Sequence, residues 1–91
     1  LEFFEPDMQK FRCLAIAYEA LRQGGNMACI VNAANEIVNR AFLEDRCRFL
    51  QMGDVIAQTM QRATFINQPS YDDYVQTDDE ARRLATELLS S

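Results

Sequence analysis

The chain has 91 residues, 48% of them apolar, and a formal net charge of −5. Its length suits a single domain over residues 1–91, and its three glycines and two prolines are too few for an all-β fold, which needs many tight turns. The acidic balance, with basic residues scattered along the chain, argues against nucleic acid or an anionic membrane as a partner.

The first residues include the large apolar side chains of Leu1, Phe3 and Phe4. Such side chains suit a piece of a longer polypeptide better than a free terminus. We therefore expect residues 1–9 to form an extended linker or arm that precedes the first helix.

A first helix is predicted over residues 10–23. Its large apolar residues recur at helical spacing, and smaller ones occupy the other side, which indicates a helix with neighbours on more than one side. The large set is Phe11, Leu14, Tyr18 and Leu21, and the small set is Cys13, Ala17 and Ala20. Gly24 and Gly25 follow and should end the helix, because glycine is the usual residue beyond a helix C-terminus.

A second helix is predicted over residues 27–44, with Asn26 as its N-cap. Projected at about 100° per residue, its apolar side chains form one broad stripe. The stripe consists of Met27, Ile30, Val31, Ala34, Ile37, Val38, Ala41 and Phe42.

Three asparagines and a glutamate share the opposite sector of this helix: Asn32, Asn35, Glu36 and Asn39. They could face water, contact another part of the protein, or bind a small polar ligand. Amides offer both a donor and an acceptor, which suits docking onto another backbone. We expect Asn32, Asn35 and Glu36 to take part in an inter-domain contact, and Asn39 to face water.

Two further helices are predicted over residues 52–63 and 70–89. Phe49 and Leu50, before the third helix, are expected to plug the end of the core. Ser70 is the expected N-cap of the fourth helix, in which a kink near Thr77 is left open and Arg82 and Arg83 are expected to pair with the preceding acids. Burying these apolar stripes against one another predicts an all-α fold, a small bundle of three to four helices.

Signatures of catalysis and of metal or cofactor binding are missing from the sequence. It contains no histidine, no GxSxG, no GxGxxG and no phosphate-binding loop. The three cysteines, Cys13, Cys29 and Cys47, lack metal-ligand spacing and suit core packing in a reducing, cytoplasmic setting. The acidic residues 72–73 and 78–80 lack the spacing of a calcium loop and fit the starts of helices. We predict no catalytic, cofactor-binding or metal residues.

An ordered series of motifs resembles a known family. It comprises Pro6-Asp7, CLAIAYEAL at residues 13–21, Gly24-Gly25, NAANE at residues 32–36, Ala41-Phe42-Leu43, Arg48-Phe49 and DDEARRLA at residues 78–85. The series resembles the C-terminal part of 1-deoxy-D-xylulose 5-phosphate reductoisomerase. Arg12 and Ala28 depart from the family, which commonly has proline at these two helix starts.

This resemblance implies that the chain has no catalytic role of its own. The parent enzyme converts 1-deoxy-D-xylulose 5-phosphate to 2-C-methyl-D-erythritol 4-phosphate in non-mevalonate isoprenoid biosynthesis, using NADPH and a divalent cation, Mg²⁺ or Mn²⁺, usually as a homodimer. The resemblance places the catalytic, metal and NADPH-binding residues upstream of Leu1. We therefore expect a non-catalytic domain, inactive alone, that supports the catalytic domain. The alternative is a free-standing helical protein–protein interaction module.

Overall fold

The structure is a computed structural model that describes the backbone of residues 5–90 and the side chains of residues 12–90. It contains four α-helices: α1 (Glu5–Gln23), α2 (Met27–Leu43), α3 (Phe49–Arg62) and α4 (Tyr71–Ser90). No β-strand occurs between residues 5 and 90. The predicted all-α bundle is therefore confirmed.

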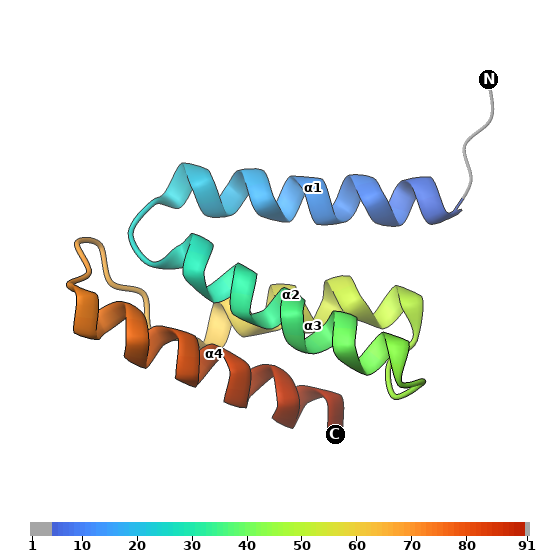
Figure 1. Ribbon diagram of the computed structural model, residues 1–91. Coiled ribbons are helices and arrows are strands. Elements are labelled where there is room, and N and C mark those ends of the chain that lie inside the picture. The colour runs from blue at the N-terminus through green and yellow to red at the C-terminus, as the bar shows by residue number, and fades with distance from the viewer. Residues whose placement is uncertain (1–4, 91) are drawn as a thin grey trace.

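The helices α2 and α3 form the middle of the bundle, with α1 on one side and α4 on the other (Figure 1). The helix α2 packs against all three others, whereas α1 and α4 do not contact each other in the described part of the chain. The molecule consequently has two seams, one under α1 and one under α4.

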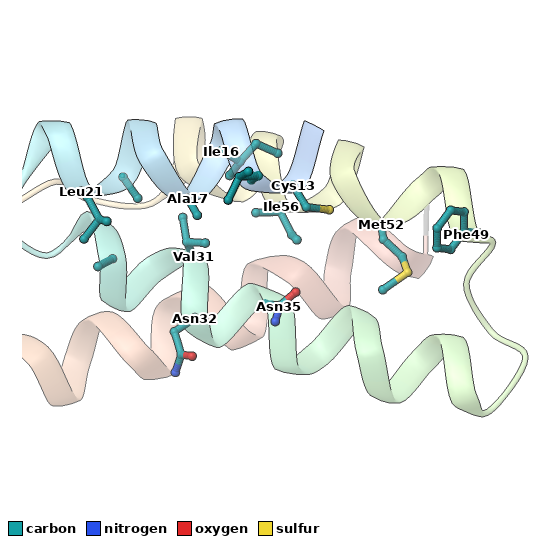
Figure 2. Close-up of a pocket in the computed structure, with 13 residues that line it drawn as sticks. Cys13, Ile16, Ala17, Leu21, Val31, Asn32, Asn35, Phe49, Met52 and Ile56 are labelled. Carbon is teal, nitrogen blue, oxygen red and sulfur yellow. The ribbon is translucent and has the colours of Figure 1, made fainter. Parts of the chain in front are cut away.

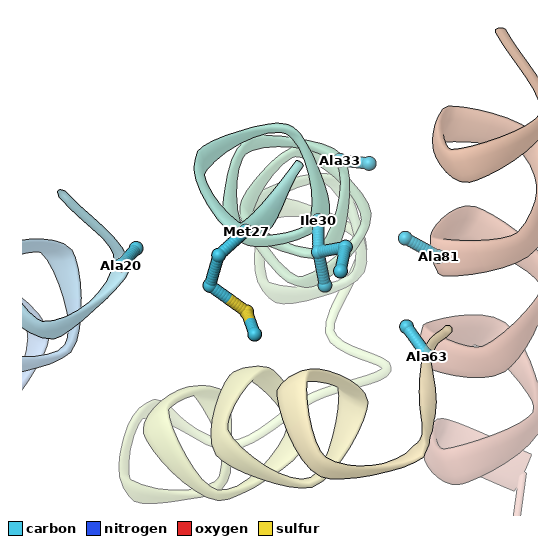
Figure 3. Packing of buried hydrophobic residues seen from close by; sticks show 6 residues of the cluster. All are labelled: Ala20, Met27, Ile30, Ala33, Ala63 and Ala81. Atoms are coloured by element: carbon cyan, nitrogen blue, oxygen red, sulfur yellow. The ribbon is translucent and has the colours of Figure 1, made fainter. Parts of the chain in front are cut away.

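Small side chains allow α2 and α4 to approach closely. Figure 3 shows Ala33 of α2 and Ala81 of α4 pointing toward each other's helix, and both are fully buried. A neighbouring buried cluster contains Ala34 and Ala85 at 0% exposure, one residue from each of the same two helices. Alanines at both positions keep the two backbones near each other, which makes this seam the tight side of the bundle.

The start of α1 differs from the prediction. The helix begins at Glu5, so residues 5–9 are helical and the expected extended arm over residues 1–9 is wrong for them, while residues 1–4 lie outside the described residues. Pro6 lies in the first turn, where the missing N–H costs no helical hydrogen bond and the fixed φ suits a helix.

The helix α3 also begins earlier than predicted, at Phe49 and not at Met52. The side-chain oxygen of Gln51 accepts a hydrogen bond from the backbone N–H of Arg48 at 3.0 Å, which stabilises this early start. Phe49 and Leu50 therefore lie in the first helical turn, 38% and 58% exposed. They do not plug the core, as the sequence had suggested, and Phe49 instead packs on the ring of Phe42 at 5.9 Å between centroids.

The turn between α1 and α2 depends on two glycines in the left-handed region. Gly24 has φ +72° and Gly25 has φ +56°, as expected for residues that end a helix. A Cβ at Gly25 would also collide with the carbonyl oxygen of Ile66 in the α3–α4 loop. This turn is thus pressed directly against that loop.

Asn26 occupies the predicted N-cap position of α2 but does not cap the helix with its side chain. The amide is fully buried and binds elsewhere: Nδ2 donates to the Thr64 carbonyl at 2.9 Å and to Thr77 Oγ1 at 2.8 Å. Its Oδ1 accepts from the Ile66 N–H at 2.8 Å. The cap interpretation of its side chain was wrong, because two partly buried backbone groups of the α3–α4 loop and the buried Thr77 hydroxyl of α4 bind the amide instead.

The start of α4 follows the prediction. Ser70 Oγ accepts from the Asp73 N–H at 3.2 Å, and Asp73 Oδ2 accepts from the Ser70 N–H at 3.0 Å. This reciprocal pair satisfies two otherwise unpaired donors. The helix then runs without interruption from Tyr71 to Ser90, which resolves the open question of a kink near Thr77.

Candidate functional site

The helix α1 buries Ala20 and exposes three of its large apolar side chains. Ala20 is 2% exposed and contributes to the core, whereas Leu14, Tyr18 and Leu21 are 53%, 67% and 70% exposed. Within this domain α1 lies only against α2 and α3. The expected second neighbour, over the large side chains, is therefore not found among the described residues.

A hollow of about 610 Å³ runs between α1, α2 and α3, and we call it the α1 groove (Figure 2). Leu14 and Leu21 of α1 and Phe49 of α3 contribute large side chains to its lining, and Val31 and Ile56 contribute from the interior. Among the residues whose side chains the structure describes, no charged one lines it, and the polar lining residues are Asn32 and Asn35. An apolar hollow without a charge is suited to apolar side chains and not to a phosphate or a metal ion.

The predicted contact residues of α2 border two different neighbours in the bundle. Asn32, Asn35, Glu36 and Asn39 are all exposed on the outer side of α2, as the helical projection indicated. Asn32 and Asn35 lie at the α1 groove. In Figure 2, Val31 points toward α1, whereas the amide of Asn32 points away from it.

Glu36 faces the other seam. Its Oε1 accepts from Arg82 Nη2 of α4 at 2.8 Å, and Arg82 Nε donates to Asp78 Oδ2 at 2.9 Å. The hydrogen bonds that Arg82 donates, first to Asp78 and then to Glu36, raise the pKa of its guanidinium, which stays charged. Glu36 thus has a partner inside the domain, which the sequence did not reveal because the two residues are 46 positions apart.

Arg83 does not follow the expected pairing with the acids before it. Its Nη1 lies 3.4 Å from Oε2 of Glu87, one turn later in α4. Both side chains are more than half exposed, so this pair stabilises the helix little.

Cys29 and Cys47 show no sign of activation. Both are free thiols, and Cys47 is buried. Burial raises the pKa of the Cys29 thiol, with a further contribution from the nearby Asp78 carboxylate, and burial also raises the pKa of the Cys47 thiol. Thiols with raised pKa values are poor nucleophiles near neutral pH, which fits the predicted role of small apolar groups.

Among the described residues, no group of three or more His, Cys, Asp or Glu side chains is arranged to hold a metal ion. None of the described helices is both long and apolar enough to cross a bilayer.

The α1 groove is the feature that sequence reasoning missed. The large and small residues of α1 indicated two apolar sides, but the pattern did not indicate which side would pack against the other helices.

Comparisons with known proteins place the sequence in a family. The family model described as the DXP reductoisomerase C-terminal domain matches residues 1–84. The 1-deoxy-D-xylulose 5-phosphate reductoisomerase of Bacteroides thetaiotaomicron is 62% identical over 98% of this chain and 23% of its own length. Its counterpart from Phocaeicola vulgatus is 60% identical over 100% of the chain and 24% of its own length. That of a Thermoanaerobacter species is 42% identical over 90% of the chain and 22% of its own length.

The chain therefore spans about a quarter of the length of these relatives. The match to the family model extends over nearly all of its residues, and the motifs noted in the sequence lie within the region shared with the first two relatives. This chain belongs to the family of DXP reductoisomerase C-terminal domains.

Proposed function

We propose that this chain is the non-catalytic C-terminal helical domain of a 1-deoxy-D-xylulose 5-phosphate reductoisomerase and supports that enzyme's catalytic domain. The observation that carries the proposal is the family match over residues 1–84, together with relatives of that name whose length is about four times that of the chain. The parent enzyme would convert 1-deoxy-D-xylulose 5-phosphate to 2-C-methyl-D-erythritol 4-phosphate in cytoplasmic isoprenoid biosynthesis, working as a homodimer.

The chemistry of that reaction needs groups that we assign to the rest of the enzyme. NADPH supplies a hydride, and a divalent cation such as Mg²⁺ or Mn²⁺ polarises substrate oxygens. The acidic pair that α2 and α4 bring together, Glu36 and Asp78, is engaged with Arg82. We therefore place the catalytic, metal-binding and NADPH-binding residues in the part of the enzyme that this chain does not include.

A supporting role needs a rigid body and a contact surface. The bundle supplies the first through its tight α2–α4 seam and the buried Asn26 network. For the second we propose a contact that includes Asn32 and Asn35, whose exposed amides can donate to and accept from another backbone. Glu36 would contribute from its place beside Arg82, at the edge of the same surface.

The test uses the full-length enzyme and the 91-residue chain side by side. NADPH oxidation is followed with 1-deoxy-D-xylulose 5-phosphate and Mn²⁺. We expect turnover by the full-length enzyme, none by the 91-residue chain, and loss of turnover or thermal stability when the domain is deleted. Turnover by the isolated chain would contradict the non-catalytic assignment, and an unchanged enzyme after deletion would contradict the supporting role.

The amide contact has its own test. Asn32→Ala with Asn35→Ala in the full-length enzyme should lower kcat/KM or the melting temperature, because amides buried in an interface would lose their partners. Asn39→Ala is the matched control on the same helix face and should leave both values unchanged. Wild-type behaviour of the double variant would exclude the two amides from the contact.

A further inference from the structure

We propose that the α1 groove is the docking site for an apolar segment from the preceding part of the same polypeptide. This interface presupposes the proposed function, since it requires that the chain be one domain of a longer enzyme. It adds a location and a chemistry: the main contact is apolar and lies along α1, and the amides of α2 form its rim.

The large apolar side chains along the groove are unusually exposed for a surface that faces water. Leu14, Tyr18 and Leu21 lie three and four residues apart on α1, so they form one stripe, and each is more than half exposed. Two of them also line the groove, whose described lining residues, from Cys13 to Ile56, carry no charge. Contiguous apolar surface of this kind marks an interaction site more often than a solvated face.

The shape of the groove suits a peptide segment. Small residues, Ala17 and Ala28, lie between the larger Leu14, Leu21 and Phe49, so a hollow of about 610 Å³ is open at the surface. Side chains from one face of a helix could enter such a hollow in the manner of helix-in-groove recognition. Asn32 and Asn35 at the edge would satisfy polar groups of the incoming segment, as polar rims do in other interfaces.

The length of polypeptide outside this domain argues for the occupant. The domain is C-terminal in its family and covers 23% of the relative from Bacteroides thetaiotaomicron, so most of that polypeptide precedes it. A preceding segment joins the domain on the side where α1 begins, and α1 forms one wall of the groove. The covalent link gives that segment a high effective concentration, an advantage that a second copy of the chain does not have.

Hydrogen exchange on the full-length enzyme tests the proposal. The backbone amides of α1 over residues 13–21 should exchange at least roughly tenfold more slowly in the full-length enzyme than in the 91-residue chain, because docking suppresses local opening of this edge helix. The first turns of α4, residues 71–76, are exposed on the other side and should exchange equally in both. Equal exchange of residues 13–21 in the two proteins would overturn the proposal.

Paired variants assign the protection to the groove. Leu14→Ser with Leu21→Ser, which removes two exposed side chains of the groove lining, should return α1 exchange in the full-length enzyme to the rate in the 91-residue chain and lower the melting temperature. In the 91-residue chain the same pair should leave helix content and melting temperature unchanged, since both side chains are exposed there. The matched control, Leu43→Ser with Tyr71→Ser, removes side chains that are 82% and 80% exposed away from the groove and should change neither protein.

The other possible outcomes of these experiments also support or overturn the docking proposal. An equal loss of stability in both proteins would show that the stripe acts only within the domain, and protection of α1 that rises with the concentration of the 91-residue chain would show that a second copy occupies the groove. Either result overturns the proposal. If the full-length enzyme has no reductoisomerase activity but protects α1, the proposed function fails and the docking site stands. If activity requires the domain while α1 gains no protection, only the docking site fails.

Discussion

The buried amide of Asn26 offers the sharpest test of how this domain is held together. Replacing it by alanine removes three hydrogen bonds at once, to the Thr64 carbonyl, the Thr77 hydroxyl and the Ile66 N–H. The amide is fully buried and connects the start of α2 to both the α3–α4 loop and α4. Few other side chains in the domain join three segments so far apart in sequence.

The expected loss in the free energy of unfolding follows from the polar groups that would lose their hydrogen-bond partner. A net hydrogen bond contributes about 0.5–1.5 kcal/mol, and a buried group left unpaired costs about 1–3 kcal/mol. The Thr77 hydroxyl oxygen would lose a donor but can turn its own proton and lone pairs toward other groups, whereas the Ile66 N–H and the Thr64 carbonyl are fixed by the backbone. We expect Asn26→Ala to lower the free energy of unfolding by about 3 kcal/mol, a large share of the stability of a domain this small.

Urea unfolding of the 91-residue chain, followed by circular dichroism, measures this loss. Asn39→Ala, on the exposed side of the same helix, is the control and should change the free energy of unfolding by less than about 0.5 kcal/mol. A loss below about 1 kcal/mol for Asn26→Ala would refute the reasoning, because it would mean that water or relaxation replaces all three bonds.

The Asn26→Asp variant adds a pH dependence with a defined sign. It keeps the shape but removes the two N–H donors, and burial raises the pKa of the new carboxyl in the folded state above its unfolded value of about 3.9. The folded state then binds more protons than the unfolded state between the two pKa values, so stability falls as pH rises through the folded pKa. The deficit relative to the wild type should therefore be smallest at low pH, and an equal deficit at pH 3.5 and pH 7 would contradict this account.

Three further substitutions test other contacts by the same unfolding measurement. Gly25→Ala should destabilise more than Gly24→Ala, since both have positive φ but only the Cβ at position 25 would meet the Ile66 carbonyl, and equal losses would show that strain alone matters. Arg82→Met should cost at most about 1 kcal/mol, because its two ion pairs are partly exposed, and the loss should shrink in high salt. Ala81→Leu should cost about 1–3 kcal/mol by overpacking the α2–α4 seam, and a neutral result would mean that the seam is looser than its full burial indicates.

Local signals in the sequence determined the elements of this fold. Helical spacing of apolar residues predicted four helices, and all four are present. Two helix boundaries were also correct in detail, the end of α1 at Gly24-Gly25 and the start of α4 at the Ser70–Asp73 pair, because each depends on groups at most three residues apart. The starts of α1 and α3 were misplaced by several residues, since helix ends depend on weak preferences that neighbouring contacts override.

Only the tertiary structure decided the surroundings of side chains that could have taken either of two positions or partners. The amide of Asn26 could cap a helix or join the α3–α4 loop, Glu36 could face water or pair with Arg82, and the large residues of α1 could face the core or the surface. In each case the outcome depends on partners far away in the sequence, which periodicity does not encode. The sequence by itself thus determined which segments are helical and which of their faces are apolar, whereas the packing of α1 against only α2 and α3 decided which apolar face is left uncovered.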